Sequence, residues 1–424
     1  MPTVDAVNMT PPTPLPQCTG SGVARQDTGA SEVTVNWLSS AGTCKGAYVH
    51  VPFCFHKCHY CDFFSVVGQE GLQGDYLHAI EKELAAVGPH CRPIESIFIG
   101  GGTPTLLEAP LLARLLEGIQ QHIPMEIGAE WTVEANPETI DQDIAEVLRC
   151  GGVNRVSIGA QSFDQNCLDA LDRRHDPEKV ASAVERLRVA GISSINLDII
   201  FAIPDQTLDM VRRDLDAVIA INPEHVSCYG LTYEPGTPLH RRRAQGQVRS
   251  VSQDRERDMF TLVMDRLGSA GFEHYEISNF ARSGHACRHN LLYWTNGNWW
   301  PFGPSAAGHV SGRRWRNIPR LADYLTADPM PPIDQLETTS EDVAAGESFM
   351  MRLRLRRGMP RTRVETLLGC VGGEKRAKAI ELHREAGLLE WRDDYLRLTE
   401  DGLYLADTVI GDLLCTGTAT MADT

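Results

Sequence analysis

Short apolar runs alternate with amphipathic stretches along the middle of the chain. The apolar runs have the length of strands and are nearly continuous; they occupy residues 47–51, 96–100, 130–135, 155–159, 195–200 and 225–230. Between them, apolar residues recur at helical spacing over residues 75–87, 110–119, 139–148, 177–190 and 208–221. Strands that alternate with helices in this way are typical of a parallel sheet covered by helices. The pattern predicts an α/β fold of six βα units, which right-handed crossovers curl into a barrel or an open partial barrel.

A different pattern follows from about residue 340. Residues 361–368 and 375–386 have helical character, and residues 388–407 fit a β-hairpin turning at Asp393 and Asp394, followed by a closing helix. The preceding stretch FMMRLRLRRGM has no decisive period. Two helices and a wing predict a smaller, winged-helix-like α+β domain over residues 336–415, after a core over residues 41–335. Residues 1–40, rich in Pro, Thr, Ser and Gly, are expected to be a disordered tail, and residues 416–424 a second tail.

Composition narrows the class of protein. Hydrophobic residues make up 42% of the 424 residues, as in globular proteins with a sizeable core. The net charge of -16 argues against nonspecific binding to nucleic acid, and no apolar run is long enough to span a bilayer. No secretory signal is visible at the start. Of twelve cysteines, three are clustered and nine scattered, which fits reduced thiols and one metal site in a cytoplasmic protein.

The polar residues that interrupt the apolar pattern gather where strands end. A cysteine-rich loop follows the first strand and Gly100–Gly101–Gly102 follow the second. Glu134 ends the third strand, Gln161 follows the fourth, and Asp198 lies inside the fifth. Each feature alone has an ordinary explanation, such as a tight turn or a satisfied core carboxylate. Together they predict a ligand site at the carboxyl ends of the strands, where α/β folds place such sites.

The cysteine loop carries the most specific chemistry. Residues 48–64 read YVHVPFCFHKCHYCDFF, so Cys54, Cys58 and Cys61 have CxxxCxxC spacing. Three thiolates on one loop leave a four-iron cluster with one iron free to bind a ligand. The alternatives are three buried cysteines or a zinc site completed by His50, His56 or His59. The spacing resembles that of the radical S-adenosylmethionine (SAM) superfamily, in which the open iron chelates SAM.

Further motifs narrow this resemblance. GGGTPT, EANP, NRVSIGAQSF, LDRRHD, NLDIIFAIPDQT and YEISNFAR followed by CRHNLLYW are similar to the oxygen-independent coproporphyrinogen III oxidase family, and most closely to its HemW branch of haem chaperones. The resemblance covers most of the chain from about residue 46. It implies a partial (β/α)6 TIM-like radical SAM barrel and a HemN-type C-terminal domain.

The resemblance also implies roles for individual residues. Cys54, Cys58 and Cys61 would ligate a [4Fe-4S] cluster. SAM would be bound by nine residues: Tyr48, Tyr60, Gly101, Gly102, Thr103, Glu134, Gln161, Arg173 and Asp198. The guanidinium of Arg173 suits a carboxylate, and Gln161 and Asp198 suit ribose hydroxyls.

One residue separates the two branches of the family. The oxidases have a fourth cysteine two residues after the third, and this chain has Phe63 there. The segment His289, Asn290, Tyr293 and Trp294 resembles the HNxxYW motif assigned to haem binding in the HemW branch. An imidazole can ligate iron, and aromatic rings can lie against a porphyrin. The alternative is a structural role, in which the protein satisfies the hydrogen bonds of the histidine and the aromatic pair packs the open side of the barrel.

Three functions follow from these observations. The favoured one is a haem chaperone that passes haem to an apo-haemoprotein, with a transient membrane-protein acceptor among the candidates. The second is a coproporphyrinogen III oxidase. The third, a nucleic-acid-binding winged helix, has only the arginines between residues 352 and 363 in its favour. The acidic chain favours an interdomain or solvated role for those arginines, so no nucleic-acid partner is expected.

Overall fold

The computed structural model describes residues 38–414, and the parallel core sheet matches the predicted strands closely. Its six strands are β1 (Gly46–Val51), β2 (Ile94–Gly101), β3 (Met125–Ala135), β4 (Arg155–Gln161), β5 (Ser194–Phe201) and β6 (His225–Gly230). Each pairs in parallel with the next in chain order. The prediction of a parallel α/β core is therefore confirmed.

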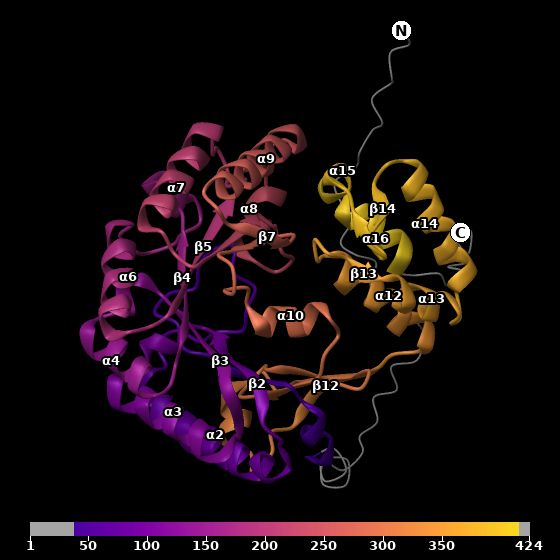
Figure 1. Cartoon of the computed structure of the whole chain (residues 1–424). Helices are drawn as coiled ribbons and strands as arrows, with labels where there is room; N and C mark the ends of the chain where they lie inside the picture. Colours follow the sequence, from indigo (N-terminus) through magenta and orange to yellow (C-terminus); the bar gives the residue numbers. More distant parts are fainter. Residues whose placement is uncertain (1–37, 415–424) are drawn as a thin grey trace.

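Helices cover the outer side of this sheet, as Figure 1 shows. They are α2 (Gln73–Val87), α3 (Ala109–His122), α4 (Gln142–Cys150), α6 (Glu178–Ala190) and α7 (Leu208–Ile221). Several begin at side-chain caps: Asp141 accepts from the Ile144 N–H and Thr207 from the Met210 N–H. Asn222 ends α7 in the left-handed conformation, with φ of 55°.

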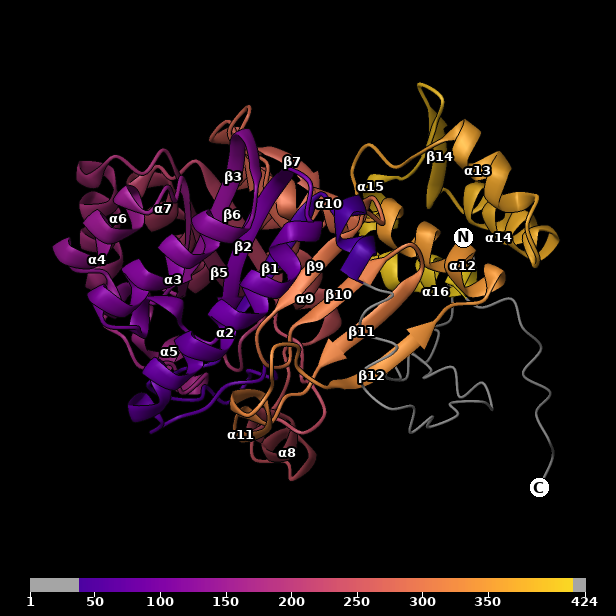
Figure 2. The same ribbon diagram turned by 90° about the horizontal axis from the view of Figure 1, so that it is seen from below.

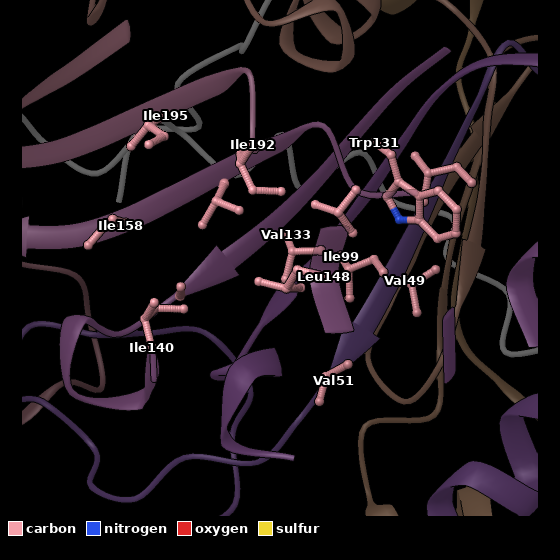
Figure 3. Packing of buried hydrophobic residues seen from close by; sticks show 14 of the residues in the cluster. Val49, Val51, Ile99, Trp131, Val133, Ile140, Leu148, Ile158, Ile192 and Ile195 are labelled. Carbon is pink, nitrogen blue, oxygen red and sulfur yellow. The ribbon is translucent and has the colours of Figure 1, made fainter. Parts of the chain in front are cut away.

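Alternation within the strands sorts side chains between the two faces of the sheet. Val49, Ile99, Val133, Ile158 and Ile195 are buried against the helices (Figure 3). The intervening positions point to the interior of the curved sheet, and many are polar. The outward-facing set forms the main core, and the inward-facing set is free to build a site.

The sheet extends beyond the six units without closing. Its order is β12-β11-β10-β9-β1-β2-β3-β4-β5-β6-β8-β7, so β12 (Ile333–Thr338) and β7 (Glu273–Glu276) are the two edges. On the β1 side, β9 (Trp299–Phe302) is parallel to β1, and β10 (Ala307–Val310), β11 (Arg313–Asn317) and β12 continue antiparallel (Figure 2). β8 (Asn279–Ala281) pairs antiparallel with β6. The result is a partial barrel, and α10 (Arg288–Trp294) lies across its open side (Figure 1).

The remaining described helices lie between or beyond these strands. In the core they are α5 (Gln165–Ala170), α8 (Pro238–Ala244), α9 (Gln253–Ser269) and α11 (Leu321–Leu325), with short 3-10 turns at residues 39–43, 70–72, 88–90, 104–106 and 137–139. The predicted tail lies outside the described residues over 1–37, but Ser39 and Ser40 already belong to the first 3-10 turn. The predicted tail over 416–424 also lies outside the described part of the chain.

The C-terminal domain has the predicted helix–helix–wing outline. Helices α12 (Glu341–Leu353), α13 (Arg361–Leu368) and α14 (Gly373–Glu385) precede the hairpin of β14 (Leu389–Arg392) and β15 (Tyr395–Leu398), to which β13 (Met359–Pro360) adds a third strand. Asp393 and Asp394 form the turn with φ of 49° and 62°, as a tight hairpin requires. The ambiguous FMMRLRLRRGM stretch is the end of α12 and a connection to β13. In place of one closing helix there are two, α15 (Glu400–Tyr404) and α16 (Ala406–Leu414).

The two domains meet at the edge strand β7. Ile277 donates to the Arg354 carbonyl at 3.1 Å, and Arg356 donates to the Tyr275 carbonyl at 3.0 Å. Glu276 and Leu355 thereby form an antiparallel bridge. The sequence predicts that the core ends at residue 335. In the structure, β12 stays paired in the barrel sheet through Thr338, so the C-terminal domain begins after that residue.

Candidate active site

The cysteine loop is held in place by backbone hydrogen bonds on both sides. Cys54 N–H donates to the Val66 carbonyl and Val66 N–H donates to the Pro52 carbonyl, at 3.0 and 2.8 Å. His50, one position before the end of β1, hydrogen-bonds the Phe64 carbonyl through Nε2 at 2.9 Å. The loop therefore returns to the strand from which it starts, and its three thiols face the same space.

That space is a cavity of about 520 Å³ at the carboxyl ends of the parallel strands, as predicted. Cys54, Cys58 and Cys61 line it, with Cys58 buried and the other two half-buried. Burial raises the pKa of Cys61 to about 11. Cys54 Sγ lies 3.8 Å from the Thr103 hydroxyl, and Arg173 Nη1 lies 3.8 Å from Cys58 Sγ. A hydrogen-bonded, partly buried set of three thiols on one wall fits the ligands of an iron–sulfur cluster.

The zinc alternative fits this arrangement poorly. His50 is used by Phe64 and by the Tyr48 hydroxyl, while His56 Nε2 and His59 Nε2 lie 2.7 and 3.3 Å from Asp172. Within residues 38–414, no group of three His, Cys, Asp or Glu side chains is arranged to hold a single metal ion. A four-iron cluster spreads its thiolates over separate irons, so it does not need such a convergence.

The glycine segment after β2 packs directly under the cysteine loop. Gly102 donates to the Val51 carbonyl at 2.8 Å, and a Cβ at this position would lie 2.6 Å from the Phe53 carbonyl oxygen. Gly101 has φ of 102° and donates to Glu134 Oε2 at 3.1 Å. Thr103 donates to the Phe53 carbonyl at 2.7 Å. These three N–H groups are thus engaged within the protein, which leaves carbonyls and the Thr103 hydroxyl to contact a ligand.

Two carboxylates line the cavity from β3 and β5, which are separated by β4. Burial, and then the charge of Asp198, raise the pKa of Glu134 to about 7. Burial also raises the pKa of Asp198, although its carboxylate accepts from Asn196 Nδ2 at 2.7 Å and from the Ser157 hydroxyl at 3.0 Å. Half-buried carboxylates that face an open cavity are favourable sites for a cationic or hydroxyl-bearing ligand.

Arg173 brings the positive charge on the same wall. Its Nη2 donates to the Gly159 carbonyl at 2.9 Å, and its buried Nε has no hydrogen-bond partner. Gln161 lies beside it with φ of 63°, and a Cβ on Gly159 would touch both side chains. An unpartnered guanidinium N–H at a cavity wall fits an anionic group such as a carboxylate. The donors, acceptors and thiols present therefore fit both a cluster and SAM.

Among the predicted SAM residues, Tyr48 alone does not line the cavity. Its hydroxyl lies 3.1 Å from His50 Nδ1 and its ring stacks on Phe98 with centroids 6.3 Å apart. Tyr48 thus supports His50, which in turn holds the cysteine loop. Burial lowers the pKa of His50 to about 4, so the imidazole is neutral in this role.

A polar layer inside the barrel is not among the features predicted from the sequence. Sheet register places Glu134, Ser157, Asn196 and His225 side by side, and Gly159, Asp198 and Ser227 form the next row. These residues occupy every second position of their strands, so the period-two polar pattern within runs such as HVSCYG was the available signal. Treating these strands as nearly continuous apolar runs overlooks this polar pattern.

This layer continues through His225 to the base of α10. His225 Nδ1 lies 2.6 Å from Asn196 Oδ1, and its Nε2 lies 2.8 Å from the Tyr275 hydroxyl. Tyr275 accepts in turn from the N–H of Cys287, the residue that precedes α10, at 3.3 Å. Since burial holds the pKa of His225 well below its usual value, the neutral ring links Asn196 to Tyr275.

The predicted haem segment forms α10, but only Asn290 of its four candidates lines the cavity. His289 is buried, with Nδ1 3.0 Å from the Ser96 hydroxyl and Nε2 2.9 Å from the Tyr293 hydroxyl. Burial lowers the pKa of His289 to about 3. Trp294 lies under the Arg354 guanidinium, 4.8 Å from its ring centroid. In this conformation the segment packs the open side, and ligation of iron by His289 requires one of its two hydrogen bonds to break.

Comparison with known proteins agrees with this geometry. Residues 48–218 match the radical SAM superfamily and residues 339–405 match the HemN C-terminal domain. The chain is 37% identical over 376 residues to heme chaperone HemW of Mycobacterium tuberculosis, covering 87% of this chain and 94% of that protein. It is 34% identical to heme chaperone HemW of Escherichia coli, covering 86% and 96% of the two chains. The chain belongs to the HemW family of radical SAM proteins.

The solved structures add a match to the fold. Coproporphyrinogen III oxidase (HemN) from Escherichia coli superposes with a TM-score of 0.77 at 21% identity, covering 89% of this chain and 92% of that one. The likeness confirms the partial-barrel fold and the attached C-terminal domain. Among the helices of the described residues, none has the length and apolar character needed to cross a membrane.

Asp198→Ala is expected to weaken SAM binding about tenfold while leaving the cluster in place, because a half-buried carboxylate that faces the cavity contributes on the order of 1.5 kcal/mol through charged hydrogen bonds. Isothermal titration of SAM into anaerobically reconstituted protein measures the effect. Asp209→Ala, on the exposed side of α7, is the matched control. Unchanged SAM affinity in both Asp198→Ala and Arg173→Ala would contradict the proposed pocket.

Proposed function

We propose that this chain is a cytoplasmic haem chaperone, which binds haem and passes it to apo-haemoproteins on a radical SAM scaffold. Cys54, Cys58 and Cys61 would hold a [4Fe-4S] cluster. The cavity lined by Glu134, Gln161, Arg173 and Asp198 would hold SAM, with Tyr60, Gly101, Gly102 and Thr103 on its walls. The cluster and SAM supply redox and radical chemistry in this superfamily, and the residues of this chain bind and orient them.

The carrying observation is the similarity to proteins named heme chaperone HemW over nearly their whole length. The cysteine loop supports the same assignment. Phe63 stands where the oxidases have a further cysteine, and its side chain is 64% exposed at the rim of the cavity. An exposed aromatic ring cannot replace a thiol as a metal ligand or a hydrogen donor.

For haem itself we propose the α10 segment, with His289, Asn290, Tyr293 and Trp294. His289 Nε2 can meet iron only if the Tyr293 hydroxyl moves away, so haem binding would be accompanied by a rearrangement of α10. The acceptor proposed is an apo-haemoprotein, including membrane-bound ones. Nucleic acid is not proposed as a partner, because Arg356 and Arg361 pair with Glu400 and Asp394.

An oxidase remains the second candidate because the cavity retains all three thiols together with its polar walls. The two functions separate in a paired anaerobic assay with cluster, SAM and a reductant. The chaperone assignment predicts stoichiometric haem binding and no steady formation of protoporphyrinogen from coproporphyrinogen. Steady turnover would overturn it.

His289→Ala is expected to change the haem absorption spectrum and to weaken haem binding at least about tenfold, the scale of one lost strong interaction. His78→Ala, an exposed histidine on α2, serves as the control. If His289→Ala and Trp294→Ala both leave haem affinity unchanged, α10 is packing alone and the haem site lies elsewhere.

A further inference from the structure

A second cavity lies on the far side of α10 from the cysteines, between the barrel and the C-terminal domain. It measures about 340 Å³ and is called here the interdomain pocket. Leu291 and Thr295 form the barrel side, and Arg352, Leu355, Arg357 and Tyr395 form the other. Since Asn290 lines the first cavity, α10 is a wall shared by both.

The interdomain pocket carries positive charge without a counter-charge. No carboxylate is among its lining residues in the described part of the chain. Within residues 38–414, the Arg352 guanidinium donates to the Thr295 carbonyl alone, at 3.3 Å, and Arg357 lies over the Tyr395 ring at 4.4 Å. Burial lowers the pKa of the Arg352 guanidinium, and the nearby positive charge of a third arginine, Arg363, lowers it further. Arg363 donates to the neutral Ser348 hydroxyl, at 3.5 Å.

This absence of pairing distinguishes the pocket from its surroundings. On the same segment, Arg356 pairs with Glu400 and Arg361 pairs with Asp394. The whole chain carries sixteen more acidic than basic charges, so acidic partners are abundant. Like charges placed together at a cavity without a carboxylate cost folding energy, and an anionic ligand relieves that cost.

The walls indicate what kind of anion fits. Leu291, Leu355 and Pro360 are apolar, and the rings of Tyr275 and Tyr395 line the same space. A purely inorganic anion makes no use of aliphatic and aromatic walls. The volume is at the small end of ligand pockets. The pocket therefore suits one edge of a flat amphipathic molecule whose rim carries carboxylates, with guanidinium forks at those carboxylates.

We infer that the interdomain pocket binds the propionate edge of haem, with Arg352 and Arg357 at the carboxylates and Leu291 and Tyr395 against the porphyrin rim. The inference rests on the proposed haem-binding function and adds to it the part of the ligand that the C-terminal domain recognises. It does not depend on which group ligates iron, because the propionates lie on one edge of the ring and the iron at its centre.

The experiment compares haem with its dimethyl ester, in which both carboxylates are blocked. We expect the wild-type chain to bind haem at least about tenfold more tightly than the diester, the scale of one charge-assisted hydrogen bond. The Arg352→Gln/Arg357→Gln double variant is expected to bind haem as weakly as the wild type binds the diester, and to show no difference between the two ligands. Arg384→Gln, on an exposed pair with Glu381, is the matched control and should behave as wild type.

Each outcome has a distinct meaning. If the wild type and the double variant bind haem and the diester equally well, the pocket assignment is wrong while haem binding stands. If the wild type binds neither ligand, both the pocket and the proposed function fail. A gain in thermal stability with short duplex DNA that disappears in the double variant would assign the arginines to nucleic-acid phosphates and overturn the inference. Retained SAM binding confirms that the double variant is folded.

Discussion

Replacing Cys58 with serine is expected to abolish the visible iron–sulfur absorption of anaerobically reconstituted protein. Cys58 is the buried member of the three thiols, and its Sγ lies 3.8 Å from Arg173 Nη1, which donates to it. A serine hydroxyl stays protonated where a thiolate would ligate iron, and no other thiol of the loop can take its place. Iron and sulfide content per chain should fall from about four each to near zero, the stoichiometry of one four-iron cluster.

The control for this loss is a cysteine away from the cavity. Cys150 is exposed at the end of α4, and Cys150→Ser should retain full iron content. Cys54→Ser and Cys61→Ser should behave as Cys58→Ser does. Full cluster content in all three single variants would show that the loop does not hold the cluster.

Replacing Arg376 with alanine is expected to lower the free energy of unfolding of the C-terminal domain by about 3 kcal/mol, the usual cost of removing one partner of a buried ion pair. Arg376 is fully buried and donates to the carbonyls of Leu413, Val371 and Asp342 and to the Asp342 carboxylate. The variant leaves these acceptors unpaired and opens a cavity. Hydrogen exchange of the backbone amides of residues 341–414 in increasing urea reports on this domain, whereas six of the chain's seven tryptophans lie outside it.

Arg384→Ala is the matched comparison, because Arg384 pairs with Glu381 on the exposed face of the same helix. Exposed pairs contribute about 0.5 kcal/mol or less. If the two variants lose a similar free energy of unfolding, the burial of Arg376 does not make its ion pair more stabilising than an exposed one. Cluster and haem binding in Arg376→Ala then show whether the C-terminal domain contributes to either.

Sequence patterns were sufficient where local chemistry decides the structure. Helix α7 begins and ends at the predicted residues because Thr207 caps its start and Asn222 its end. The hairpin turn at Asp393 and Asp394 was also predicted at the correct residues. The cysteine spacing placed three thiols in one cavity because a single loop carries them all.

Long-range register was beyond the sequence. Ser157, Asn196 and His225 lie side by side on neighbouring strands. Their sequences alone do not predict this, because the register depends on how the strands pair. Whether each N–H after β2 is free or engaged is also a tertiary property, which the run of glycines does not show. His289 could not be recognised as doubly hydrogen-bonded, since Ser96 is far away in the chain.

The bridge between Glu276 and Leu355 has a practical consequence for dissecting the protein. It covers the β7 edge of the twelve-stranded sheet with backbone from the C-terminal domain. The opposite edge, β12, is exposed but carries Asp334 and Glu337, charges that discourage another strand from adding there. A core shortened to end before α12 would present the uncovered β7 edge to other chains and so be prone to self-association. Cluster, SAM and haem measurements are therefore best made on the intact chain, with any shortened core checked first by light scattering.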